Sequence, residues 1–129
     1  MFLSKNKYGI VWSTLILVVC LMPSGNLPSS SFLSFKGADK LIHFALYAVL
    51  LILVGKGLVN YFKFSYSINR IIVIAFLYCF FLGVGIECVQ SVFVVGRLGD
   101  VFDVLANIIG ASAGIVFLII HLKKRVRKT

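Results

Sequence analysis

The sequence is poor in charged residues. Only 13% of its 129 residues are charged, and just 4 of these are Asp or Glu, whereas ordinary globular domains are about 25% charged. Apolar residues make up 60% of the chain, and the mean hydropathy is +1.06. A soluble chain of this length cannot hide so much apolar surface. The composition excludes a soluble enzyme and a disordered tail, and it predicts an integral membrane protein.

Cysteine pairs and catalytic motifs are also lacking. Cys20, Cys79 and Cys88 stand apart within apolar runs and form no C-x-x-C pair. The chain therefore has neither a disulfide framework nor a cysteine zinc motif. No H-E-x-x-H, serine-nucleophile or phosphatase motif is present. We expect no cofactor and no bound metal, and whether the chain is an enzyme stays open.

Four apolar stretches are predicted to cross a membrane, which takes about 20 residues per helix. They cover residues 8–22, 41–59, 71–95 and 101–122. The first stretch is short for a span, but the aliphatic stems of Lys5 and Lys7 extend its apolar length. A cleaved signal peptide is the alternative interpretation of this stretch, although no A-x-A cleavage site follows it. Spans must satisfy their own backbone hydrogen bonds, and no alternating barrel pattern occurs. The predicted fold is all-α, a single membrane domain over residues 1–129 built as a four-helix bundle.

Positive charge is spread unevenly over the segments between these stretches. The N-terminus, the second loop and the C-terminal tail together carry 10 Lys and Arg residues, whereas the first and third loops carry 3. Lys and Arg concentrate in cytoplasmic loops. Both termini are therefore predicted to be cytoplasmic. The net charge of +9 comes from these flanking segments, and no nucleic-acid partner is expected.

Polar side chains form one stripe on each of three predicted helices, near the predicted outer surface. At helical spacing, Asp39, His43 and Tyr47 share a face of the second helix. The stripes of the other two helices consist of Gly83, Glu87, Gln90 and Ser91, and of Asp100, Asp103, Asn107, Gly110, Ala111 and Gly114. The economical arrangement turns these three stripes toward one another.

Ionisable groups within a membrane are costly, so they pair, line a cavity or serve a function. Three interpretations remain open: structural ion pairs with Lys40 and Arg97, an outward-facing ligand site, or a catalytic site. We favour the ligand site because the acids outnumber their evident cationic partners. The candidate binding residues are Asp39, Lys40, His43, Tyr47, Glu87, Gln90, Arg97, Asp100, Asp103 and Asn107. No catalytic residue is assigned.

Three blocks carry a family resemblance: "DKLIHFALYAVL" (39–50), "GVGIECVQ" (83–90) and "GRLGDVFDVLANIIGASAG" (96–114). The sequence resembles the VanZ-like family of bacterial membrane proteins. Members of that family are similar to this sequence in having three blocks in the same order: D-K-x-x-H-F-x-x-Y, E-x-x-Q and R-x-x-D-x-x-D-x-x-x-N-x-x-G. Every position of that pattern is filled, from Asp39 and Phe44 to Gly110. The first apolar stretch matches only as a hydrophobic segment.

The resemblance implies a multi-pass protein of the bacterial cytoplasmic membrane and cell envelope. The family's namesake is associated with low-level resistance to teicoplanin, but the resemblance implies no particular reaction. We expect an outer-leaflet pocket that binds a lipid, a lipid-linked cell-wall precursor or a lipoglycopeptide. The alternative is an intramembrane enzyme that hydrolyses a lipid phosphate or ester by metal-assisted or acid–base chemistry. A transporter or proton relay is the third hypothesis, for which four spans are few unless the chain forms an oligomer.

Overall fold

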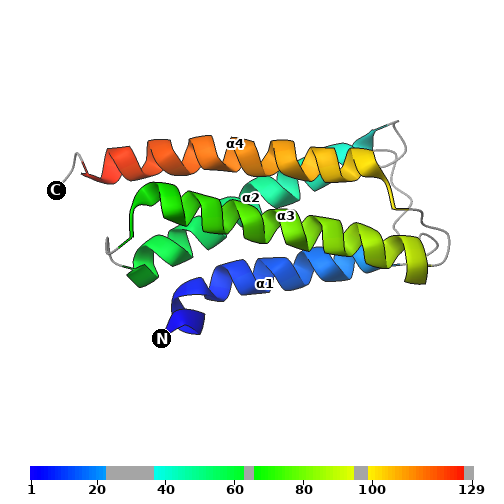
Figure 1. Cartoon of the computed structure of the whole chain (residues 1–129), viewed down its shortest axis with the longest axis horizontal. Coiled ribbons are helices and arrows are strands. Elements are labelled where there is room, and N and C mark those ends of the chain that lie inside the picture. The colour runs from blue at the N-terminus through cyan, green and yellow to red at the C-terminus, as the bar shows by residue number, and fades with distance from the viewer. Residues whose placement is uncertain (23–36, 63–65, 95–98, 127–129) are drawn as a thin grey trace.

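The computed structural model describes residues 1–22, 37–62, 66–94 and 99–126, and every regular element in these ranges is an α-helix. The helices are α1 (Phe2–Leu21), α2 (Ala38–Phe62), α3 (Ile68–Phe93) and α4 (Val101–Val126). They lie side by side along one long axis (Figure 1). The predicted all-α four-helix bundle is confirmed. The helices α1 and α3 start earlier in the chain than the apolar stretches 8–22 and 71–95, because their first turns include polar residues.

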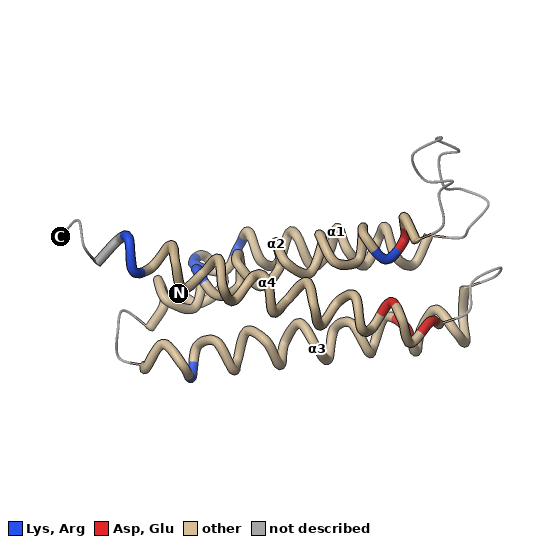
Figure 2. The backbone as a smooth tube through the Cα atoms, turned by 90° about the horizontal axis from the view of Figure 1, so that it is seen from above, with Lys and Arg blue, Asp and Glu red and all other residues tan. Residues whose placement is uncertain are grey.

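The two ends of the bundle differ in the charge of their side chains. The start of α1 and the end of α4 lie at one end, here called the terminal end (Figure 1). The four acids lie at the opposite end, where α1 and α3 finish and α2 and α4 begin; this is here called the acidic end (Figure 2). Most of the described Lys and Arg residues lie toward the terminal end (Figure 2). This polarity along the bundle axis matches the uneven charge of the sequence.

Within the described ranges, three helices are long and apolar enough to cross a membrane: α2, α3 and the first 24 residues of α4. At 1.5 Å per residue each exceeds the roughly 30 Å of a bilayer core. The helix α1, which includes all but the last residue of the first predicted stretch, is not among these three, because Lys5, Asn6 and Lys7 lower the hydropathy of its first turns. Large apolar side chains such as Phe81 and Phe93 face outward, 66% and 77% exposed. The chain is a multi-pass membrane protein.

Glycine brings α2 and α4 together. A Cβ atom on Gly110 would overlap the carbonyl group of Phe44, and one on Gly114 would lie 2.7 Å from the carbonyl oxygen of Ala48. Two helices can approach this closely only where one of them has no side chain. This close contact between α2 and α4, here called the α2–α4 seam, comes just after the first turns of both helices. It therefore keeps those first turns, which carry the polar residues, close to each other.

Gly110→Ala is expected to lower the melting temperature in detergent, because the added Cβ forces the backbones of α2 and α4 apart. Overpacking of this kind typically costs about 1–3 kcal/mol. Gly85→Ala is the matched control, since a Cβ there would meet nothing within 4 Å and alanine favours a helix. Equal melting temperatures for the two variants would contradict the close α2–α4 seam.

Polar contacts fasten α1 to its neighbours. The indole Nε1 of Trp12 donates a hydrogen bond to the carbonyl oxygen of Leu46 on α2 over 3.0 Å. The hydroxyl groups of Ser13 and Tyr78 lie 2.9 Å apart and join α1 to α3. Ile16 of α1 is fully buried in the core. The helix α1 is therefore an integral part of the bundle.

Candidate functional site

Lys40 is the centre of a polar cluster at the acidic end. Its ammonium nitrogen lies 3.0 Å from a carboxylate oxygen of Asp39, 2.7 Å from one of Asp100 and 3.0 Å from one of Asp103. One cation from α2 thus binds two carboxylates at the start of α4. The Lys40 side chain remains 35% exposed, so this part of the cluster faces the surroundings of the bundle.

Asp100 links the cluster to the start of α4. Its Oδ1 accepts a hydrogen bond from the backbone N–H of Phe102 over 2.8 Å, as an N-terminal capping residue does. Its own N–H donates to Glu87 Oε2 on α3 over 3.0 Å. The hydrogen bond from Lys40, followed by that from the Phe102 amide, holds the pKa of the Asp100 carboxyl below its ordinary value. Asp100 is therefore a charged residue at neutral pH.

A buried pair, His43 and Asn107, lies next to the lysine. His43 Nδ1 and Asn107 Oδ1 are 3.0 Å apart. An amide oxygen only accepts, so Nδ1 is the donor, and in a neutral ring Nε2 then carries the lone pair. That Nε2 lies 3.9 Å from Asp103 Oδ2, too far for a hydrogen bond. His43, Asn107 and Asp103 are 5%, 3% and 9% exposed.

Glu87 contributes a buried carboxylate from α3. The residue is 6% exposed, and its Oε1 has no hydrogen-bond partner among the described residues. Within the same part of the chain, none of the ion pairs involves Glu87. His43, Glu87 and Asp103 each offer one ligand atom, and these three atoms lie within 4.8 Å of one another. Three helices therefore place metal-ligand side chains at one buried point.

Tyr47 and Gln90 occupy the edges of this arrangement. Tyr47 is fully buried, and its hydroxyl group has no hydrogen-bond partner in the described ranges. Tyr47 and Asn107 both lie against Gly83: a Cβ on Gly83 would lie 3.4 Å from the Tyr47 hydroxyl oxygen and 3.0 Å from Asn107 Nδ2. The Gln90 amide donates instead to the carbonyl oxygen of Cys20 on α1, so Gln90 ties α1 to α3.

The predicted convergence of the three stripes is observed in the described residues. Those that meet at the acidic end are Asp39, Lys40, His43, Glu87, Asp100, Asp103 and Asn107. Ser91, placed on the same stripe as Glu87, is exposed, and its hydroxyl group bonds to Cys88 of its own helix. Arg97 lies outside the described residues.

Sequence reasoning did not single out Gly99. A Cβ there would lie 2.6 Å from the carbonyl oxygen of Glu87. The missing side chain lets the residues before α4 reach α3, which brings the Asp100 amide to the Glu87 carboxylate. The sequence signal for this approach is the second glycine of "GRLGD".

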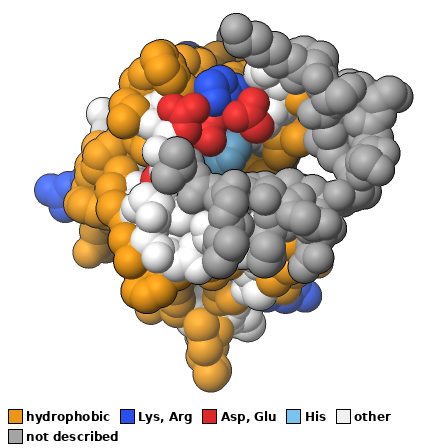
Figure 3. Space-filling view, turned by 90° about the vertical axis from the view of Figure 1, so that its right-hand side faces the viewer, with side chains coloured by type: hydrophobic (Ala, Val, Ile, Leu, Met, Phe, Trp, Pro, Cys, Tyr) orange, Lys and Arg blue, Asp and Glu red, His pale blue; other side chains and the backbone are white. Residues whose placement is uncertain are grey.

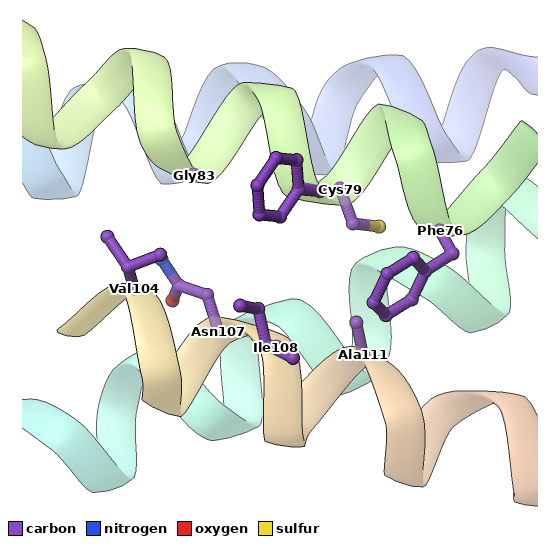
Figure 4. Close-up of a pocket in the computed structure, with 8 residues that line it drawn as sticks. Phe76, Cys79, Gly83, Val104, Asn107, Ile108 and Ala111 are labelled. Carbon is purple, nitrogen blue, oxygen red and sulfur yellow. The ribbon is translucent and has the colours of Figure 1, made fainter. Parts of the chain in front are cut away.

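The cluster faces outward at the acidic end. Acidic, basic and histidine side chains gather there in one place (Figure 3), whereas large apolar side chains such as Phe81 and Phe117 are exposed along the helices. A separate crevice between α3 and α4 is apolar apart from Asn107 (Figure 4). This crevice is too narrow for a water molecule, so the acidic end is the better candidate for a binding site.

The family called VanZ/LLP1 matches residues 3–122, almost the whole chain. The chain belongs to the VanZ/LLP1 family. An uncharacterized protein of Schizosaccharomyces pombe is 34% identical over 114 residues, which cover 88% of this chain and 66% of the yeast protein. No solved structure matches the chain. The VanZ/LLP1 match reaches beyond the three sequence blocks and includes most of α1, which agrees with the packing of α1 in the bundle.

Proposed function

We propose that this VanZ/LLP1 protein binds the polar head group of a membrane lipid at its acidic end. The observation that carries the proposal is the position of the cluster, at one end of the bundle (Figure 3), whose helices expose large apolar side chains along their length. A molecule that resides in the bilayer reaches such a site by lateral diffusion and needs no soluble domain to deliver it. The proposed ligand is therefore itself part of the membrane.

The exposed layer of the cluster suits a zwitterionic head group. Asp39, Asp100 and Lys40 are 57%, 38% and 35% exposed. The carboxylates are suited to a head-group amine, and the ammonium to its phosphate, through charge-assisted hydrogen bonds. Arg97, three residues before Asp100 in the sequence, is proposed as a second phosphate ligand.

A lipid is preferred to the other expected ligands, a lipid-linked cell-wall precursor or a lipoglycopeptide. The relative from a yeast supports this choice, because phospholipids occur in both bacterial and yeast membranes. An amino-phospholipid such as phosphatidylethanolamine fits the pairing of carboxylates with an ammonium. The ligand class is thus defined by its amine and its phosphate.

The proposed orientation places the acidic end in the outer leaflet and both termini in the cytoplasm. The concentration of Lys and Arg toward the terminal end supports it (Figure 2). In this proposal α1 is a fourth span, since its 20 residues reach about 30 Å. The proposed location is a bacterial cytoplasmic membrane.

Lipid retention by the purified protein tests the proposed function. Native mass spectrometry from detergent should show more bound phosphatidylethanolamine than phosphatidylglycerol of the same acyl chains. Asp39→Asn should reduce that preference about tenfold, the equivalent of one charge-assisted hydrogen bond. Asp39 is exposed and pairs with its neighbour Lys40, so the variant should still fold. Lys124→Met at the terminal end is the control for a change of one charge. Equal retention of both lipids by the unmodified protein would contradict the proposal.

Hydrolysis of a lipid phosphate or ester is the second candidate. His43 favours it, because this buried imidazole is oriented by its hydrogen bond to Asn107, which leaves the Nε2 lone pair to accept a proton as a general base. Incubation of the protein with phosphatidylethanolamine separates the candidates: a hydrolase releases a head group or a fatty acid, whereas a binding protein returns the lipid intact.

A further inference from the structure

We infer that His43, Glu87 and Asp103 form a binding site for one divalent metal ion, buried beside Lys40. The sequence predicts no bound metal, since it contains no metal-ligand motif; the three side chains come from three separate helices. This inference does not depend on the lipid proposal, since the two sites use different faces of the cluster.

The spacing of the donor atoms fits an ion between them. Two ligands of a tetrahedral metal ion lie about 3.4 Å apart when each bond is about 2.1 Å long. His43 Nε2 and Asp103 Oδ2 are 3.9 Å apart, wider than a hydrogen bond and close to that separation. All three ligand atoms lie within 4.8 Å of one another, so small side-chain rotations would bring them to one ion.

Asn107 prepares His43 for this role. A metal-bound histidine usually donates its other ring N–H to an oxygen that fixes the tautomer and the ring orientation. Asn107 Oδ1 occupies that position, 3.0 Å from His43 Nδ1. The Nε2 lone pair is thereby directed toward Asp103, in the arrangement that a metal ligand needs.

Glu87 supplies an independent indication of a ligand. Glu87 is 94% buried, and its Oε1 accepts no hydrogen bond from any of the described residues. A buried carboxylate oxygen without a partner is costly, and a metal ion would give it one. Its Oε2 is held by the Asp100 amide, so the carboxylate is already fixed in place.

Charge supports a cation at this point. Lys40 binds Asp39, Asp100 and Asp103, whereas Glu87 takes part in no ion pair among the described residues. Asp39, Asp100 and Asp103 also lie close enough to share an ion, but Lys40 already binds all three. The buried set is therefore the better metal site. One nitrogen and two carboxylate donors suit Zn²⁺ or Mn²⁺.

Metal titration of the full chain in lipid-free detergent tests the inference. After treatment with a chelator, calorimetry with Zn²⁺ and electron paramagnetic resonance with Mn²⁺ should detect one ion per chain. Saturating Zn²⁺ should raise the melting temperature, because an ion that binds only the folded state stabilises it. Glu87→Gln and His43→Gln should each weaken binding at least about tenfold and remove this thermal stabilisation.

Asp39→Asn is the matched control, since it removes one carboxylate from the cluster but not from the buried set. It should bind Zn²⁺ within about twofold of the unmodified protein while losing the lipid preference described above. Circular dichroism of each metal-free variant verifies folding, and having two ligand variants guards against the loss of one. Absence of binding by the unmodified protein would overturn the inference, as would unchanged binding by folded Glu87→Gln or His43→Gln. Equal loss in Asp39→Asn would also overturn it, by placing the ion among the carboxylates around Lys40.

Discussion

Lys40→Met is expected to lower the melting temperature of the protein by about 5–10 °C. Lys40 binds Asp39, Asp100 and Asp103 together, so its removal leaves three neighbouring carboxylates without their cation. The strongest effect is expected at Asp103, whose side chain is 12% exposed, because removing one partner of a buried pair strands the other charge. The partial exposure of Asp39 and Asp100 moderates the loss. Thermal unfolding of Lys40→Met and of the unmodified protein in detergent measures the difference in melting temperature.

The loss of thermal stability in Lys40→Met should depend on pH. Lys40 holds the pKa of Asp100 below its ordinary value, so this contact stabilises the fold above that value and is lost as the pH falls through the lowered pKa. The difference between Lys40→Met and the unmodified protein should therefore be large at neutral pH and shrink below about pH 4. Lys124→Met, at the terminal end, changes the net charge equally and should have little effect. A variant as stable as the unmodified protein at pH 7 would show that Lys40 does not hold the cluster together.

Thiol labelling should give an all-or-none result for the proposed orientation. In a chain whose three cysteines are replaced by alanine, Val101→Cys places a thiol at the acidic end, where Val101 is 73% exposed. Asn69→Cys places one in the exposed first turn of α3, at the terminal end. An impermeant maleimide added to intact cells should label the first and spare the second, because basic segments remain in the cytoplasm.

Membrane disruption provides the control for labelling. Once the membrane is opened, both thiols should react, which shows that each is accessible. Labelling of Asn69→Cys but not Val101→Cys in intact cells would reverse the proposed orientation and place the acidic end in the cytoplasm.

The helical repeat explains how much of the site could be predicted. Asp103 and Asn107 are one turn apart, as are Asp39 and His43, so each pair had to share a face of its helix. Because a polar face is costly against lipid, the faces were expected to meet, and they do. Three of the four helices followed from apolar length, whereas the first apolar stretch, residues 8–22, is short for a span and needed the stems of Lys5 and Lys7 to extend it.

Contacts between helices could not be predicted in the same way. The repeat fixes a residue's direction on its own helix but not the rotation or height of the neighbouring helix. Lys40 adjoins Asp39 in the sequence, yet it also reaches across to Asp100 and Asp103. Gln90 shares a stripe with Glu87 but bonds to α1. Both outcomes depend on which helix packs against Gly110 and Gly114 and on the position of α1; the glycine spacing predicts a close approach, but no local pattern names the partner helix.

The bond between Trp12 and Leu46 gives the molecule an intrinsic optical probe. Trp12 is the only tryptophan in the chain, and its indole N–H donates to a backbone carbonyl of α2. Indole fluorescence is sensitive to the polarity of its surroundings and to hydrogen bonding at the ring nitrogen. Selective excitation of the indole therefore reports on one place, the contact between α1 and α2. Separation of α1 from the bundle can be followed by emission from the unlabelled, unmodified protein.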